Sequence, residues 1–115
     1  MDCANGVGSI VMKELVGLSG FSERLNITFI NDDKEPHFLN SECGAEHLKN
    51  QKLPANWSVK DHAMLKCVSF DGDADRQIYF YGDHEGKLTV IDGDKQFSLI
   101  MMYIKNLLKA LNIED

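Results

Sequence analysis

The sequence contains one segment suited to metal chemistry, the acidic loop that runs from Asp71 to Arg76. Its three carboxylates alternate with small residues. On a continuing strand they would point to one face, where like charges repel one another. In a turn that Gly72 allows, they can converge on one point, and carboxylate oxygens suit Mg²⁺, Mn²⁺ or Ca²⁺. We therefore expect a divalent-metal site with Asp71, Asp73 and Asp75 as ligands.

Two other interpretations of the acidic loop compete with a metal site. An EF-hand would need Gly at position 6 and Glu at position 12 of its loop, where this chain has Arg76 and Gly82. A solvated acidic turn is the simpler alternative, because Asp and Gly favour turns. The position directly after an apolar strand favours the metal site. Arg76 can either pair with the neighbouring aspartates or hold a phosphate beside the metal.

The elements around the acidic loop predict an α/β domain. Strand-like residues 66–70 lead into it, and ligand sites in open α/β sheets gather at the carboxyl ends of strands. We expect residues 1–115 to form one domain, with a mixed, mostly parallel sheet of about four strands and flanking helices. The other predicted elements are helices near 9–20, 45–50 and 97–111, strands at 25–30, 77–81 and 87–91, a hairpin turn at 82–86, and a loop at 51–62.

The ends of the chain add further expectations. Residues 1–4 read as the last residues of a strand that begins upstream, and Ser9 reads as the cap of the first helix. The final helix has the clearest pattern, with apolar residues at helical spacing. They are Phe97, Ile100, Met101, Ile104, Leu107, Leu108 and Leu111.

Two further motifs share features with binding sites. Residues 5–8 (Asn-Gly-Val-Gly) have the G-x-G of a phosphate-binding loop, but we favour a simple strand-to-helix turn. Residues 92–95 (Asp-Gly-Asp-Lys) offer only two carboxylates, so we expect them to cap the final helix. His62 and His84 are expected to be solvated.

Composition restricts the partners. The 115 residues are 43% hydrophobic and carry a net charge of −6, without clustered basic residues, so we expect no nucleic-acid partner. No apolar run approaches the ~20 residues of a membrane span. Three widely spaced cysteines (Cys3, Cys43 and Cys67) lack the spacing of a zinc site and indicate reduced thiols in a cytoplasmic protein.

At several blocks the sequence resembles the α-D-phosphohexomutases. The acidic loop resembles the metal loop of that family. The insertion at 51–65 and the long hairpin resemble the eukaryotic branch that acts on an N-acetylated hexosamine phosphate. The matching blocks are 2–8, 39–40 with 43–45, 67–76 and 90–95.

This resemblance implies that the chain is the second of four domains. The family's phosphoserine, sugar-reading loop and phosphate site lie on the other domains, so the chain alone is expected to be inactive and to meet its phosphosugar only through them. The implied reaction interconverts N-acetylglucosamine 6-phosphate and 1-phosphate through a bisphosphate, toward UDP-N-acetylglucosamine. Asp71, Asp73 and Asp75 match the Mg²⁺ ligands, and Arg76 matches the arginine beside the transferred phosphoryl group.

Two alternatives remain open at this point. The substrate can be glucosamine phosphate or another phosphohexose, since the specificity loop lies outside the chain. The chain can also be a free-standing, non-catalytic metal-binding module.

Overall fold

The computed structural model describes residues 1–18, 20–33 and 35–113. Helices and strands both occur, which confirms the α/β class. In chain order the elements are α1 (Gly8–Gly17), the 3-10 turns η1 (Phe21–Glu23) and η2 (Pro36–Phe38), α2 (Ala45–Lys49), α3 (Val59–His62), β1 (Cys67–Phe70), β2 (Gln77–Gly82), β3 (Leu88–Ile91) and α4 (Gly93–Ala110).

Strand β2 lies at the centre of the sheet, with β1 and β3 antiparallel on either side. Along β2, Ile78 and Phe80 are buried while Tyr79 and Tyr81 are exposed, as expected when alternate side chains point to opposite faces. The turn between β2 and β3 forms the predicted hairpin. The acidic loop joins β1 to β2, so the sheet holds both of its ends.

The predicted sheet of about four mostly parallel strands is not what the described residues show. They contain three strands, all antiparallel. Parallel pairing is limited to single bridges from Asp2 to Ile30 and to Ser69. The short segment 1–3 lies between them, with the Cys3 N–H donating to the Ile30 carbonyl (3.0 Å). Three residues are too few for a parallel ladder, so the segment predicted as a strand at 25–30 forms a β-bridge at its last residue only.

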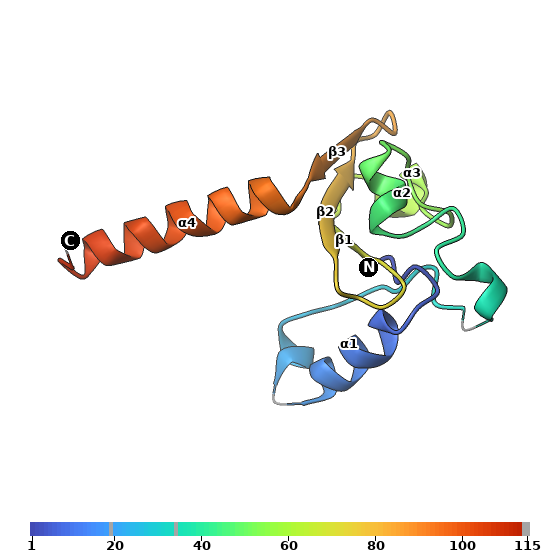
Figure 1. The fold of residues 1–115 in the computed structure, drawn as a ribbon, viewed down its shortest axis with the longest axis horizontal. Helices are drawn as coiled ribbons and strands as arrows, with labels where there is room; N and C mark the ends of the chain where they lie inside the picture. Colours follow the sequence, from blue (N-terminus) through green and yellow to red (C-terminus); the bar gives the residue numbers. More distant parts are fainter. Residues whose placement is uncertain (19, 34, 114–115) are drawn as a thin grey trace.

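A small core lies between α2 and one face of the sheet, where Figure 1 shows α2 and α3 together. Leu48 of α2 is fully buried against Ile78 and Phe80. Trp57 packs against this cluster from the segment before α3. Cys3, Cys43 and Cys67 are buried and free, which confirms the predicted reduced thiols. The core therefore fixes β1 and β2, the strands that carry the acidic loop.

Helix α4 has the predicted apolar stripe, but it extends away from the sheet (Figure 1) and none of its residues is buried. The sequence predicted helices that flank the sheet, and in the described residues α4 is not one of them. Exposed fractions along the stripe include 65% for Phe97 and 55% for Ile100. A search of the described residues finds no helix with the length and apolarity needed to cross a membrane.

Two local predictions were wrong. Ser9 does not cap α1, because the helix already begins at Gly8 and Ser9 lies buried within it. The segment 51–62 is not all loop. It ends in α3, where the Ser58 hydroxyl accepts a hydrogen bond from the Asp61 N–H (3.2 Å), and His62 lies partly buried there. The signal for α3 was the Ser-x-x-Asp spacing of a helix cap.

Candidate metal site

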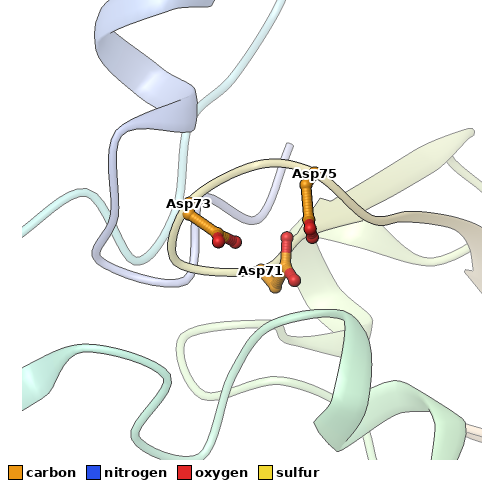
Figure 2. Close-up of side chains that lie close together, drawn as sticks. All are labelled: Asp71, Asp73 and Asp75. Carbon is orange, nitrogen blue, oxygen red and sulfur yellow. The ribbon is translucent and has the colours of Figure 1, made fainter.

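The acidic loop leaves the sheet at the carboxyl end of β1 and returns at the start of β2 (Figure 2). Backbone hydrogen bonds close it. The Asp71 N–H donates to the Arg76 carbonyl (3.3 Å), and the Ala74 N–H donates to the Asp71 carbonyl (3.1 Å). The strand ends therefore hold the loop as a compact turn, at the edge of the sheet where the sequence predicted it.

The structure brings together the three predicted aspartates. One carboxylate oxygen of each of Asp71, Asp73 and Asp75 lies within 4.8 Å of the others, and Figure 2 shows the side chains turned toward the centre of the loop. Asp71 is buried and the other two are exposed. This is the one group of three or more potential metal-ligating side chains among residues 1–18, 20–33 and 35–113. The buried Asp71 carboxylate is therefore held in place, while the exposed carboxylates of Asp73 and Asp75 can adjust to an ion.

Gly72 serves the loop differently from what the sequence suggested. We expected its conformational freedom to form the turn, but the residue with positive φ is Ala74 (61°). Gly72 is required for space instead. A Cβ there would lie 2.7 Å from Leu39 Cδ1 and 2.9 Å from Asn40 Nδ2. The segment around residues 39–40 thus packs directly on the loop backbone.

The turn before α1 supports the other side of the loop. The Val7 N–H donates to the Gly72 carbonyl (3.0 Å). A Cβ on Gly6 would lie 2.1 Å from the same oxygen. This backbone-to-backbone contact assigns Gly6 a packing role, in agreement with the predicted strand-to-helix turn.

Arg76 is paired with carboxylates in this structure. Its Nε donates to Asp71 Oδ2 (2.6 Å) and lies 3.7 Å from Asp75 Oδ1. Its Nη1 donates to Glu46 Oε2 (3.3 Å). The side chain stays 61% exposed, so the guanidinium lies at the surface beside the three aspartates. Glu46 was missed by the sequence analysis, because nothing local links residues so far apart in the chain.

The acidic loop has three carboxylates and one guanidinium, and the pKa values of two of the carboxylates shift in opposite directions. Burial acts to raise the pKa of the Asp71 carboxyl, but hydrogen bonds from the Arg76 side chain and N–H outweigh it and hold that pKa below its ordinary value. The pKa of Asp75 is raised, because its carboxyl shares a hydrogen bond with Asp71 and faces the charge of Asp73. The acidic loop thus holds more negative charge than Arg76 balances, which a bound cation would relieve.

The second acidic turn caps a helix, as predicted. Asp92 is the N-cap of α4, and its Oδ1 accepts from the Lys95 N–H (3.1 Å). Asp94 lies in the first turn, where a negative charge is favourable.

The chain is similar in sequence to known proteins. Residues 1–78 match the family model described as phosphoacetylglucosamine mutase AMG1, domain II. The chain is 41% identical to human phosphoacetylglucosamine mutase over 118 residues and 40% identical to the Candida albicans protein over 114 residues. These matches cover 98% and 97% of the chain, but 21% and 20% of the relatives.

The chain is also similar in fold to a solved structure. The crystal structure of Aspergillus fumigatus N-acetylphosphoglucosamine mutase in complex with GlcNAc-6P and magnesium superposes with a TM-score of 0.83 at 37% identity. The match covers 94% of the chain and 22% of that structure. The chain therefore corresponds to about a fifth of its relatives' length.

Proposed function

Because this chain belongs to the phosphoacetylglucosamine mutase family, where it matches domain II, we propose that residues 1–115 are the metal-binding domain of such an enzyme. The reaction interconverts N-acetylglucosamine 6-phosphate and N-acetylglucosamine 1-phosphate, as an intramolecular phosphoryl transfer. The observation that carries the proposal is the convergence of Asp71, Asp73 and Asp75 within 4.8 Å. The phosphoserine belongs to another domain of the longer protein, so the chain alone is inactive.

The residues of the acidic loop fit Mg²⁺. Oxygens around one Mg²⁺ lie at most ~4.2 Å apart, since each bond is ~2.1 Å. The 4.8 Å limit on the three oxygens is close to that spacing, and the exposed Asp73 and Asp75 can rotate inward. Asp71 and its hydrogen bonds from Arg76 form the fixed side. When bound, the ion supplies electrostatic stabilisation for phosphoryl transfer.

The proposed role of Arg76 is to hold the substrate phosphate next to the ion. Its Nε stays with Asp71, which fixes the direction of the guanidinium. Its contact with Glu46 is long (3.3 Å) and exposed, so a phosphate can replace it at little cost. Charge-assisted bonds from a guanidinium suit a phosphate.

The wider structure supports a domain of a larger enzyme. The exposed apolar stripe of α4 is suited to contact with other domains, through which the phosphosugar is reached. The bridges of Asp2 to Ile30 and Ser69 provide the start of the predicted parallel pairing, which we propose becomes a mixed sheet of about four strands in the longer protein. Three free, buried cysteines favour a reducing compartment, the cytoplasm.

A Mn²⁺ titration tests the metal site. In ¹⁵N spectra of the chain, we expect paramagnetic broadening centred on residues 71–76. Asp73→Asn should weaken it, because one ligand oxygen and one charge are lost. The matched control is Asp83→Asn, at the distant hairpin turn, which should leave the broadening unchanged. Broadening elsewhere, or equal in Asp73→Asn and the wild type, would refute the ligand assignment.

The reaction is tested separately in a chimaera in which this chain replaces the matching segment of the human relative. We expect ³¹P NMR to show interconversion of N-acetylglucosamine 6-phosphate and 1-phosphate, and Asp73→Asn to reduce its rate strongly. A preference for glucosamine 6-phosphate or glucose 6-phosphate would favour the alternative substrates. A soluble, metal-binding chimaera with no mutase activity would favour the non-catalytic module.

A further inference from the structure

A buried carboxylate outside the acidic loop lies against β1, the strand that leads into the loop. Asp2 is 1% exposed, and none of the ion pairs found among the described residues includes it. Burying a carboxylate is costly unless hydrogen bonds compensate it. Here they do, because Asp2 accepts four of them. The donors are Ala4 N–H (3.2 Å) and Asn31 Nδ2 (2.9 Å) to Oδ1, and Gly44 N–H (2.8 Å) and Ser69 Oγ (2.6 Å) to Oδ2.

These donors belong to the segments that surround the acidic loop. Ser69 lies on β1, two residues before Asp71. Ala4 begins the turn whose Val7 N–H donates to the Gly72 carbonyl. Gly44 ends the segment from residue 39 to residue 44, whose side chains leave no space for a Cβ on Gly72.

The backbone of Asp2 adds to the same connection. Its N–H donates to the Val68 carbonyl (2.8 Å), and its carbonyl accepts from the Phe70 N–H (3.1 Å). Asp2 is therefore bonded through backbone and side chain to β1 immediately before the acidic loop begins.

We propose that Asp2 is a positioning residue for the metal site: its carboxylate binds β1, the turn before α1 and the 39–44 segment to one another, and so fixes the acidic loop between them. Asp2 itself touches neither metal nor substrate. This inference rests on the proposed function, since the position of the loop matters for the reaction only if the loop binds a metal.

The chemistry of the site requires a carboxylate and not an amide. All four partners of Asp2 donate, and an ionised carboxylate is an acceptor only. In Asp2→Asn, one orientation turns the amide NH₂ toward the Gly44 N–H. The other turns it toward the Ala4 N–H. Either way a backbone donor faces a donor, and one contact between the surrounding segments is lost.

Two variants test the proposal in the 115-residue chain. Asp2→Asn should weaken Mn²⁺ binding roughly 10- to 100-fold, the range known for residues that orient metal ligands. Ser69→Ala removes one of the four bonds without changing charge, and should weaken binding by a smaller factor. Asp83→Asn is the control, because Asp83 also accepts two backbone N–H bonds (2.9 Å each), but in the hairpin turn. It should bind Mn²⁺ like the wild type.

A second readout does not need metal. Amide hydrogen exchange of Ala74 and Arg76, whose N–H groups both bond to Asp71, should accelerate in Asp2→Asn and Ser69→Ala relative to Asp83→Asn. Exchange should be measured at a temperature well below the unfolding midpoint of each variant. Circular dichroism gives that midpoint, so that the exchange rates refer to folded protein. If Asp2→Asn does not fold, Ser69→Ala decides the question.

The possible outcomes separate the two proposals. Wild-type affinity and wild-type exchange in the folded variants, even with lower stability, would overturn the role of Asp2, because a purely structural residue gives that result. If the wild type binds no Mn²⁺, the proposed metal function fails. The exchange data then still decide whether Asp2 positions the loop.

Discussion

Replacing Gly6 by alanine is expected to displace the acidic loop without altering any of its residues. A Cβ at this position would lie 2.1 Å from the Gly72 carbonyl oxygen, 2.6 Å from its Cα and 2.7 Å from its carbonyl carbon. All three are backbone atoms, so no side-chain rotation can relieve the contact. The turn before α1 or the loop itself has to move.

The size of this movement follows from ordinary contact distances. Carbon atoms pack at ~3.5–4.0 Å, so the Gly72 backbone and the new methyl group have to separate by roughly 1 Å or more. Overpacking of this kind typically costs ~1–3 kcal/mol of stability. The shift should also lengthen the hydrogen bond from the Val7 N–H to the Gly72 carbonyl and displace the adjacent residues Asp71 and Asp73. We expect Mn²⁺ affinity to fall roughly 10- to 100-fold.

Gly17→Ala provides a matched control. Gly17 is the last residue of α1, and a Cβ there meets nothing within 4 Å. In a helix, alanine is more favourable than glycine by ~0.5–1 kcal/mol, so this variant should be slightly more stable and should bind Mn²⁺ like the wild type. Urea unfolding measures the stability change, and line broadening at residues 71–76 measures the affinity.

The outcome that would refute this reasoning is specific. If Gly6→Ala folds with wild-type stability and wild-type Mn²⁺ affinity, the close approach of the two backbones does not hold the acidic loop. A loss of stability with unchanged affinity in the folded fraction would separate the packing role of Gly6 from the metal site.

Three further predictions concern the rest of the domain. Asp92→Ala should remove the cap of α4, cost ~1 kcal/mol and lower the helical signal in circular dichroism; an unchanged signal would contradict the cap. Burial, as the main cause, raises the pKa of Cys3 and of Cys43 to about 12 from an ordinary 9.0. Their contribution to stability is then complete below pH 9.0 and lost as the pH rises toward 12, so urea midpoints should fall over that range, and less so in a Cys3→Ala, Cys43→Ala variant. Gly82→Ala should destabilise the domain by ~1–3 kcal/mol, because the Cβ of the new alanine would lie 2.5 Å from the ring of Trp57. Urea unfolding followed by the fluorescence of Trp57 measures this loss.

Much of the local structure was predictable because it depends on neighbouring residues. The alternation along β2, the hairpin to β3 and the cap of α4 each follow from side chains a few positions apart. The same dependence on neighbouring residues led to the prediction of too many parallel strands. A β-branched pattern at 25–30 reports strand propensity, while a strand also needs a partner, and segment 1–3 pairs there only through single bridges.

The spacing of apolar residues could not predict how α4 packs. Its helical spacing predicts an apolar face and says nothing about what covers it. In the described residues that face is exposed along the helix.

By itself the sequence determined the chemistry of the site: three carboxylates, their spacing and a turn directly after an apolar strand. Their convergence is a local consequence of that spacing. Only the tertiary structure showed what holds the loop in place, because the buried carboxylate of Asp2, the backbone contact of Gly6 with Gly72 and the pairing of Arg76 with Glu46 join residues far apart in the chain. Such contacts arise from how segments pack, and no local spacing encodes them.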